Sequence, residues 1–370
     1  MAGLFIDKKG IELKLKGEVL ICYENEKRVG TIPINPIDRI YLKGNVKIQS
    51  SLLAKLGEKG IGVISLHGRQ NKPTLFLPQP HNDAYRRIAQ YVLANNELFC
   101  VVFSKQLIQL KFLTQQMWLK EAISVKPKCT FEIEEQIKLL TELSQKVQYQ
   151  KNLASLRGIE GIAAKQYFST LAQYLPSSLK FSGRNRRPPK DPFNVALSLA
   201  YTLLHSEAVF TCYANGLDPY IGFYHALDFG RESLACDLIE PLRPLVDDWL
   251  IKLFQQKELR VEYFSNSENG CFLTKAGRVN FYKAYEQVVK KWRKILSENC
   301  LDITHLLQQL KLLNMPQRKS QNFLNITESL TDFEWQKLLA HYYFNQCNLL
   351  QKIEFKSLNR ETAIEDLEND

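Results

Sequence analysis

Three side chains that could bind a divalent metal lie close together in the segment Gly216–Pro244. His225 follows a Gly-Leu-Asp-Pro turn, and the carboxylates of Asp237 and Glu240 come shortly after it. Apolar residues at helical spacing after Ser233 predict a helix, and residues three apart on a helix share a face. We therefore expect Asp237 and Glu240 to point the same way, toward His225. The alternative is a solvated pair of acids and a structural histidine.

A further carboxylate, Glu160, lies in the helix-forming segment LRGIEGIAAKQYF. Gly158 and Gly161 beside it each weaken a helix by about 1 kcal/mol relative to alanine, so their presence needs a reason. Close approach of a metal-bound phosphate is one reason. Tight packing against a neighbouring helix, with Glu160 merely exposed, is the other, and the residues alone leave both open.

A basic loop follows, with the sequence FSGRNRRPPK at Phe181–Lys190. Arg184, Arg187 and Lys190 concentrate positive charge there, and two prolines keep the segment out of a helix. Such a loop suits phosphate contact, because each neutralised phosphate releases counterions; an ordinary solvated loop is the alternative. The whole chain carries a net charge of +10 with a pI near 9.0, which favours a polyanionic partner such as nucleic acid.

The elements that must position these residues divide the chain in two. Residues 1–78 show short apolar runs of period two, as in IELKLK at Ile11–Lys16, and these runs predict strands. Two prolines at positions 78 and 80 indicate a linker over residues 79–84. Residues 85–320 have helical patterns, and residues 321–370 are predicted to be a helical extension with an acidic tail. The predicted class is α+β: a small N-terminal β-rich domain, then a larger all-α catalytic domain.

Composition narrows the class of protein further. Eight cysteines are scattered without a CxxC pair, which favours reduced core thiols over a zinc ribbon or a disulfide framework. The start MAGLFIDKKG lacks the apolar run of a signal peptide, and no run of apolar residues approaches the length of about eighteen that marks a membrane span. We therefore expect a cytoplasmic protein without a membrane partner.

Five segments occur in one order along the chain: LRGIEGIAAKQYF, RRPPKDPFNVALSLAYTLL, GLDPYIGFYH, DLIEPLRP and GCFLTKAGR. With these motifs and its β-rich start, the chain resembles CRISPR-associated protein 1, the integrase of CRISPR adaptation, over roughly residues 1 to 320. The resemblance implies that Glu160, His225 and Glu240 are the catalytic metal ligands, with Asp237 as an accessory acid near the site. About fifty C-terminal residues extend beyond the usual end of the family.

The resemblance also implies an activity. It is that of a metal-dependent DNA integrase and endonuclease, which joins the 3′-hydroxyl ends of short captured DNA to the CRISPR array by transesterification. Two carboxylates and an imidazole suit Mn²⁺ or Mg²⁺ as the cofactor. Family members pair as homodimers through their β-rich domains, and a dimer of the small ferredoxin-like CRISPR-associated protein 2 bridges two such dimers.

Arg184, Arg187, Lys190 and Arg231 flank the implied ligands in the sequence, and we expect them to bind the DNA backbone. Two other functions stay open. One is a divalent-metal-dependent nuclease of branched or single-stranded DNA, which shortens strands where an integrase lengthens them. The other is a non-catalytic DNA-binding scaffold, against which the intact set of three ligands argues.

Overall fold

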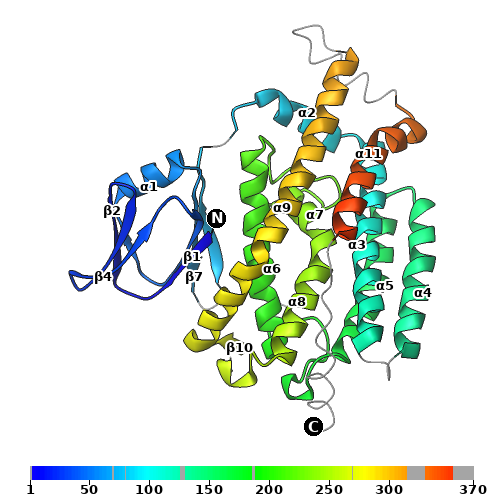
Figure 1. The fold of residues 1–370 in the computed structure, drawn as a ribbon. Coiled ribbons are helices and arrows are strands. Elements are labelled where there is room, and N and C mark those ends of the chain that lie inside the picture. Colours follow the sequence, from blue (N-terminus) through cyan, green and yellow to red (C-terminus); the bar gives the residue numbers. More distant parts are fainter. Residues whose placement is uncertain are drawn as a thin grey trace.

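The computed structural model of this chain describes residues 2–68, 71–79, 81–125, 130–185, 188–268, 270–314 and 330–352. Strands make up most of the chain before residue 78, and helices make up most of it from residue 84 on (Figure 1). The β-rich part lies against one side of the helical part, next to α6 (Pro192–Ala214) and α9 (Lys275–Asn314). The predicted α+β class, β-rich first and helical second, is confirmed.

The β-rich domain contains two four-stranded sheets and one helix. Its elements are β1 (Ala2–Asp7), β2 (Ile11–Lys16), β3 (Val19–Glu24), β4 (Lys27–Pro33), β5 (Ile37–Lys43), β6 (Lys47–Ile48), α1 (Ser50–Glu58), β7 (Gly62–His67) and β8 (Lys72–Phe76). The first sheet has the order β1-β5-β7-β8 and is parallel except for β8. The second has the order β4-β3-β2-β6 and is antiparallel except for the β2–β6 pair.

The alternation that predicted the strands also decides which faces are buried. In β2, Ile11 and Leu13 are buried, while Glu12 and Lys14, which alternate with them, are partly exposed. The buried residues join those of β1, β5, β7 and α1 in one apolar core between the two sheets. Because successive strand residues point to opposite faces, the first sheet has a second face left to cover.

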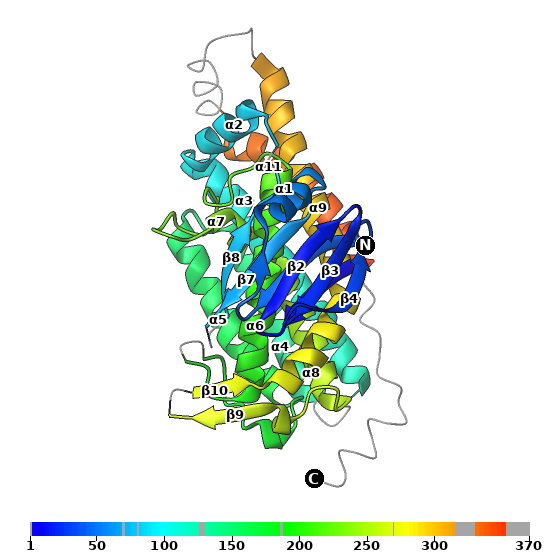
Figure 2. The same ribbon diagram turned by 90° about the vertical axis from the view of Figure 1, so that its left-hand side faces the viewer.

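That second face packs on the helical domain. Tyr41 and Ile64 belong to the same apolar core as the helices. The contact is close, since a Cβ added at Gly62 would lie 2.3 Å from Cε1 of Phe210 in α6. The hydroxyl of Tyr41 donates a hydrogen bond to Glu207, also in α6. Side-chain packing and buried polar contacts therefore join the two domains along this seam. Figure 2 shows the strands of the β-rich domain in front of the helical domain.

The helical domain is built around α6, which is buried along most of its length. The other elements are α2 (Ala84–Ala94), α3 (Glu97–Val125), α4 (Thr130–Gln148), α5 (Leu153–Ala172), α7 (Ser233–Ile239), α8 (Arg243–Gln255), α11 (Asp332–Gln351), and the hairpin of β9 (Phe264–Ser267) and β10 (Gly270–Leu273). Asp83 in the predicted linker caps α2 by accepting the backbone N–H of Tyr85 at 3.0 Å. Asp191 caps α6 in the same way, and Pro192 occupies the first turn.

By length and composition α6 could cross a membrane, which the count of consecutive apolar residues did not predict. In this fold, however, 83% of its most apolar window is buried inside the protein. Its apolar surface contacts β8, α7, α8 and α9. The apolar character of α6 is therefore explained by its central position in the helical domain.

The described part of the predicted C-terminal extension lies within the helical domain. Helix α11 packs against α3 and α9 (Figure 1), and Trp335 is buried with its ring centroid 5.0 Å from that of Phe99. Thr331 and Glu334 form a capping box at the start of this helix. Residues 321–329 and the predicted acidic tail from residue 353 lie outside the described residues.

Candidate active site

Glu160 lies in the middle of α5, on a helix surface opened by glycine. Gly158 and Gly161 are both exposed, and a Cβ added at either would meet no atom of the described residues within 4 Å. These glycines therefore do not accommodate a packed helix, which removes that explanation for their presence. They leave an open surface beside the carboxylate, where the backbone of another molecule can approach closely.

His225 lies between α6 and α7, and Asp237 of α7 orients it. Asp237 Oδ1 is 2.7 Å from Nδ1 of the imidazole and accepts the backbone N–H of His225 at 3.0 Å. Its Oδ2 accepts the backbone N–H groups of Phe223 and Tyr224. Gly222 permits this approach, because a Cβ there would lie 2.7 Å from Asp237 Oδ2. With Nδ1 bonded to the carboxylate, Nε2 is the nitrogen that faces the site.

Glu240 follows α7 in a 3-10 turn, so the prediction that it shares a helix with Asp237 is wrong. Pro241 has no N–H to continue the α-helical pattern, and the helix ends at Ile239. The carboxylate nevertheless turns to the predicted side, with Oε1 3.7 Å from Nε2 of His225. Asp237 and Glu240 thus approach the imidazole at its two different nitrogens.

Lys111 of α3 links two of the expected ligands directly. Its Nζ contacts Oε1 of Glu160 and lies 2.7 Å from Oε2 of Glu240. The other oxygen of Glu240 accepts a hydrogen bond from Nε of Arg243 at 2.8 Å, and the Tyr224 hydroxyl donates to Glu160 at 2.5 Å. Lys111 is only 8% exposed and Glu240 only 4%. Two carboxylates from separate elements therefore share one buried ammonium group.

Burial and charge act in opposite directions on these groups. Burial alone would raise the pKa of Glu240, but Arg243, Lys111 and His225 outweigh it and hold that pKa well below its usual range. Burial would lower the pKa of Lys111, yet the facing carboxylates keep it above its usual value. Burial would likewise lower the pKa of His225, and the contact with Asp237 raises it above 6.5. Glu240 and Lys111 are therefore both charged at neutral pH.

The donor set fits a divalent metal by its chemistry. Glu160 and Glu240 offer carboxylate oxygens, His225 offers Nε2, and a carboxylate behind the imidazole is typical of metal-binding histidines. Among the residues that the structure describes, no three or more His, Cys, Asp or Glu side chains are close enough together to hold a metal ion. The ammonium of Lys111 lies between the two carboxylates, where a cation shared by both would lie. A metal held by both acids would replace that ammonium.

The four basic residues expected to bind DNA have different surroundings. The guanidinium of Arg184 donates hydrogen bonds within its own loop and to Oδ1 of Asn194 at 2.7 Å, so it ties the loop to α6. Lys190 is exposed, and the side chain of Arg231 is 44% exposed. Arg187 lies outside the described residues. The exposed side chains of Lys190 and Arg231 are therefore better placed than that of Arg184 to contact a ligand.

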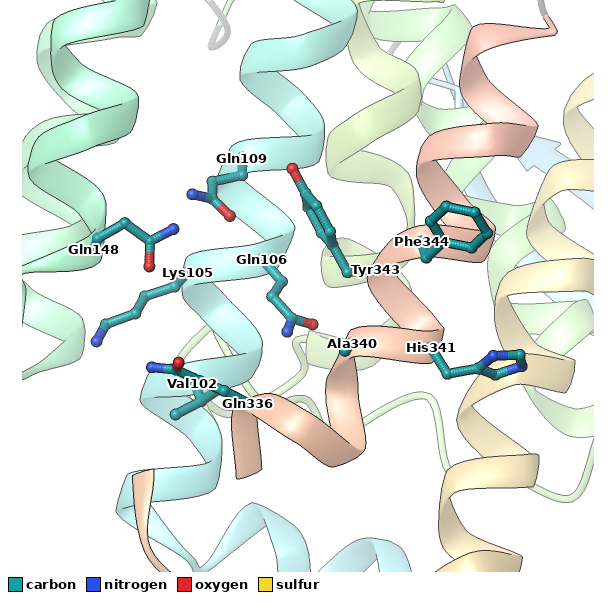
Figure 3. A pocket seen from close by; sticks show the side chains of 10 residues that line it. All are labelled: Val102, Lys105, Gln106, Gln109, Gln148, Gln336, Ala340, His341, Tyr343 and Phe344. Atoms are coloured by element: carbon teal, nitrogen blue, oxygen red, sulfur yellow. The ribbon is translucent and has the colours of Figure 1, made fainter. Parts of the chain in front are cut away.

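A cavity of about 650 Å³ lies among α3, α4 and α11, lined by four glutamines and by side chains of α11 (Figure 3). Its lining residues are Val102, Lys105, Gln106, Gln109, Gln148, Gln336, Ala340, His341, Tyr343 and Phe344. None of the acidic residues described above belongs to this lining, so the cavity is separate from the acid site.

Sequence reasoning missed three residues of the site. Arg243 could have been found, because it follows Glu240 by three positions, and Tyr224 adjoins His225. Lys111 carries no such signal. It is one lysine in a long helix, 49 positions before the carboxylate that it contacts.

Comparison with known proteins identifies the family. The model of the family described as CRISPR associated protein Cas1 matches residues 4–287. The CRISPR-associated endonuclease Cas1 1 of Thermodesulfovibrio yellowstonii is 40% identical over 298 residues, which cover 80% of this chain and 93% of the relative. A Cas1 protein from Thermotoga maritima has a similar solved structure, with a TM-score of 0.73 and 24% identity over 83% of this chain and 97% of that one.

Two other solved structures share the fold. A casposase bound to an integration product matches with a TM-score of 0.74 and 20% identity, covering 93% of this chain and all of that chain. A chain of a Cas6-RT-Cas1–Cas2 complex matches with a TM-score of 0.70 and 22% identity, covering 87% of this chain and 35% of that chain. Fold and site define a two-domain α+β protein with a buried carboxylate–histidine cluster. The chain belongs to the Cas1 family, and the resemblance of its motifs to that family is confirmed.

Proposed function

We propose that this protein is a divalent-metal-dependent DNA integrase and endonuclease of CRISPR adaptation. It joins the 3′-hydroxyl ends of short captured DNA to the CRISPR array by transesterification. One observation carries the proposal: the carboxylates of Glu160 and Glu240 share one cation, the ammonium of Lys111, and Glu240 also lies 3.7 Å from Nε2 of His225. The names of a 40%-identical endonuclease and of a casposase bound to an integration product support it.

Glu160, Glu240 and Nε2 of His225 would hold Mn²⁺ or Mg²⁺. When bound, such an ion supplies Lewis acidity toward a phosphate oxygen and charge that stabilises the transition state. Asp237 holds the imidazole through Nδ1, so that Nε2 faces the acids. Neutral Nε2 is the form that ligates, so protonation of His225 opposes metal binding.

Two further residues control the charge of one carboxylate ligand and the orientation of the other. Arg243 keeps Glu240 ionised in its buried position, because its guanidinium lies 2.8 Å from Oε1. The Tyr224 hydroxyl donates to Glu160 and thereby limits the orientations of that carboxylate. Both contacts preorganise the ligands before substrate arrives, which lowers the cost of ordering them during the reaction.

In the joining reaction, the 3′-hydroxyl oxygen of the captured DNA attacks a phosphorus atom of the array strand. A new P–O bond forms as the bond to the array strand's own 3′-oxygen breaks. The attacking hydroxyl releases its proton, and the departing 3′-oxygen takes one up. The number of phosphodiester bonds is unchanged, so the step needs no external energy source. Attack by water at the same phosphorus hydrolyses the strand, which is the endonuclease reaction.

The DNA surface that we propose extends from the glycine side of α5 to the exposed Lys190 and Arg231, with Arg187 in the same basic loop. Arg184 has a positioning role in this loop, because its hydrogen bonds tie the loop to α6. We propose DNA, a second copy of this chain paired through the β-rich domain, and a Cas2 dimer as partners. The similar chain in a Cas6-RT-Cas1–Cas2 complex supports the last of these. The cytoplasm, where the array lies, is the proposed place of action.

A metal-dependent nuclease that cuts DNA without joining it is the second candidate. The word endonuclease in the name of the 40%-identical relative favours it. The two reactions use the same site and differ in the nucleophile, so they are separated by the products. Joining lengthens a strand, and hydrolysis shortens one.

The test is a strand-transfer assay on supercoiled plasmid carrying a repeat, with labelled short duplex DNA, Cas2 and Mn²⁺. Wild type is compared with Glu160→Gln, and Glu142→Gln, an exposed glutamate on α4, is the matched control. We expect label joined to plasmid by wild type and by Glu142→Gln, and at least about a hundredfold less by Glu160→Gln. Shortened DNA without joined label would favour the nuclease. Equal joining by Glu160→Gln would contradict the proposed site.

A further inference from the structure

A cavity that the proposed function does not use lies where helix α11 meets α3 and α4. Helix α11 lies beyond residues 4–287, which the family model matches. The cavity has a volume of about 650 Å³, within the range of about 300 to 1,000 Å³ that is common for small-molecule sites. Figure 3 shows that its lining side chains come from all three helices, with α3 between the other two. A ligand bound there would contact both the helices of the family match and the C-terminal extension.

The lining contains a buried lysine without a counter-charge. Lys105 of α3 is only 8% exposed, and it makes no hydrogen bond or ion pair within the part of the chain that the structure describes. Lys111, six positions later on the same helix, is buried to the same extent but pairs with two carboxylates. Lysines are rarely so buried unless they are paired, because an isolated buried charge is costly. An anion in the cavity would balance the charge of Lys105.

The other lining residues indicate an anion with a single charge. Among the described residues, the lining includes no aspartate or glutamate. His341 also lines the cavity, and its Nε2 lies 3.0 Å from the amide nitrogen of Asn345. Because an amide nitrogen only donates, Nε2 accepts that hydrogen bond and the imidazole is neutral. One carboxylate therefore balances the one charge of Lys105, whereas a phosphate dianion would bring surplus negative charge into a buried place.

Two further features of the lining define the body of the ligand. Val102, Tyr343 and Phe344 supply apolar and aromatic surface, and Phe344 is 64% exposed, so a bound ring would cover part of it. The Oε1 atom of Gln106 is buried and accepts no hydrogen bond from the described residues. A hydroxyl on the ligand would supply the missing donor.

We propose that this cavity binds a small aromatic hydroxy acid. The carboxylate pairs with Lys105, the ring lies against Val102 and Phe344, and the hydroxyl donates to Gln106. The bound acid links α11 to α3 and α4 and thereby stabilises the packing of the C-terminal extension. The inference is independent of the proposed function, because none of the residues of the acid site lines this cavity.

The experiment is isothermal titration calorimetry on the full chain without DNA or metal, with 4-hydroxyphenylacetate as the probe. The probe's amide has nearly the same shape without the charge, and phenylacetate lacks the hydroxyl. We expect the amide to bind at least about tenfold more weakly than the acid, and phenylacetate about threefold more weakly. Lys105→Met should weaken binding of the acid at least about tenfold. Lys120→Met removes an exposed lysine from the same helix and should bind the acid as wild type does.

Two variants of α11 locate the binding. Ala340→Trp places a large ring in the cavity from an exposed position, and it should abolish binding of the acid. Lys337→Trp adds the same ring at an exposed position outside the lining and should bind as wild type does. Full binding by Ala340→Trp would place the ligand elsewhere and overturn the inference. So would equal binding of acid and amide by wild type, or binding of neither, and these two results need no variant that folds.

Discussion

Two clusters of buried charge neutralise their carboxylates in different ways. At the seam between the domains, Glu207 is completely buried and accepts hydrogen bonds from Arg293 at 2.9 Å. Arg39 lies 3.3 Å from the same carboxylate, and Asp38 lies 3.7 Å from Arg293. Two carboxylates thus face two guanidinium groups. This cluster is balanced in charge and carries the contact between the sheet and α6.

The acid site contains the same kinds of charged groups, but its negative and positive charges are not equal in number. Glu160 and Glu240 pair with two permanent cations, Lys111 and Arg243, whereas the third carboxylate, Asp237, pairs with the imidazole of His225. The site is also less enclosed, because 18% of the Glu160 side chain and 25% of the His225 side chain are exposed. A surplus of negative charge at an accessible edge attracts a cation from outside.

The difference separates stability from function. A buried cluster whose charges are balanced loses stability when any member is removed, because the remaining charges stay buried and unpaired. A cluster with an excess of carboxylates tolerates the removal of one carboxylate more easily, since the carboxylates partly repel one another. Proteins commonly keep this kind of local imbalance where a ligand must bind. The following predictions test this division, from the largest expected effect to the smallest.

Removing the central carboxylate of each cluster gives the sharpest contrast. Glu207→Ala leaves Arg39 and Arg293 buried without their partner, and we expect a loss of about 3 to 5 kcal/mol in the free energy of unfolding. Glu160→Ala should cost less than about 1 kcal/mol, because Lys111 then pairs with Glu240 alone. Urea denaturation of both variants measures the difference. Equal losses would contradict the division between the two clusters.

Asp247 provides a test by pH, because it is buried without a direct ion pair among the described residues. Burial raises its pKa to about 6, despite the hydrogen bond from Tyr201, the nearby hydroxyl of Tyr167 and the charges of Arg243 and Arg184. In the unfolded chain the carboxyl ionises near 3.8, so the folded state keeps a proton that the unfolded state has lost between these values.

Relative to Asp247→Asn, wild type should therefore lose up to about 3 kcal/mol of stability as the pH rises from about 4 to about 6. The stabilising contribution of the protonated acid is fully present below pH 3.8. Unfolding of wild type and variant at matched pH values measures the difference, in which other titrating groups cancel. A constant difference across this range would show that Asp247 does not titrate as described.

Lys111 tests the idea that the protein's own cation occupies the shared position. In Lys111→Met, Glu160 and Glu240 lose that cation, so we expect about tenfold tighter Mn²⁺ binding and lower stability without metal. Isothermal titration calorimetry on DNA-free protein measures the affinity. Lys105→Met, a buried lysine on the same helix, is the matched control and should bind Mn²⁺ as wild type does. Weaker binding by Lys111→Met would mean that the lysine supports the metal site.

Replacing a glycine with alanine is expected to give the smallest changes in stability, and these changes should differ in sign between the domain seam and the acid site. Gly62→Ala forces a methyl group against Phe210, and we expect a loss of about 1 to 3 kcal/mol in stability. Gly161→Ala meets open space within a helix and should stabilise by about 1 kcal/mol. The same methyl group would stand on the surface proposed for DNA, so joining activity should fall as stability rises. Thermal unfolding and the strand-transfer assay test both statements.

Local patterns were sufficient for the fold class and for the identity of three proposed ligands. Period-two alternation predicted strands such as β2, because half-buried strands expose alternate side chains. The resemblance of five ordered motifs to the Cas1 family implied Glu160, His225 and Glu240. Helical spacing was less reliable at Glu240, since Pro241 ends the helix that was expected to continue.

The sequence by itself therefore determined the order of a β-rich and a helical domain, the family, and the residues offered as ligands. Only the tertiary structure decided that Lys111 lies between Glu160 and Glu240, that Arg184 is tied to α6, and that the glycines of α5 face open space. The physical reason is the separation along the chain of the residues that interact. Periodicity and motifs record interactions between near neighbours in the chain, whereas charge balance and open surface depend on side chains that only folding brings together.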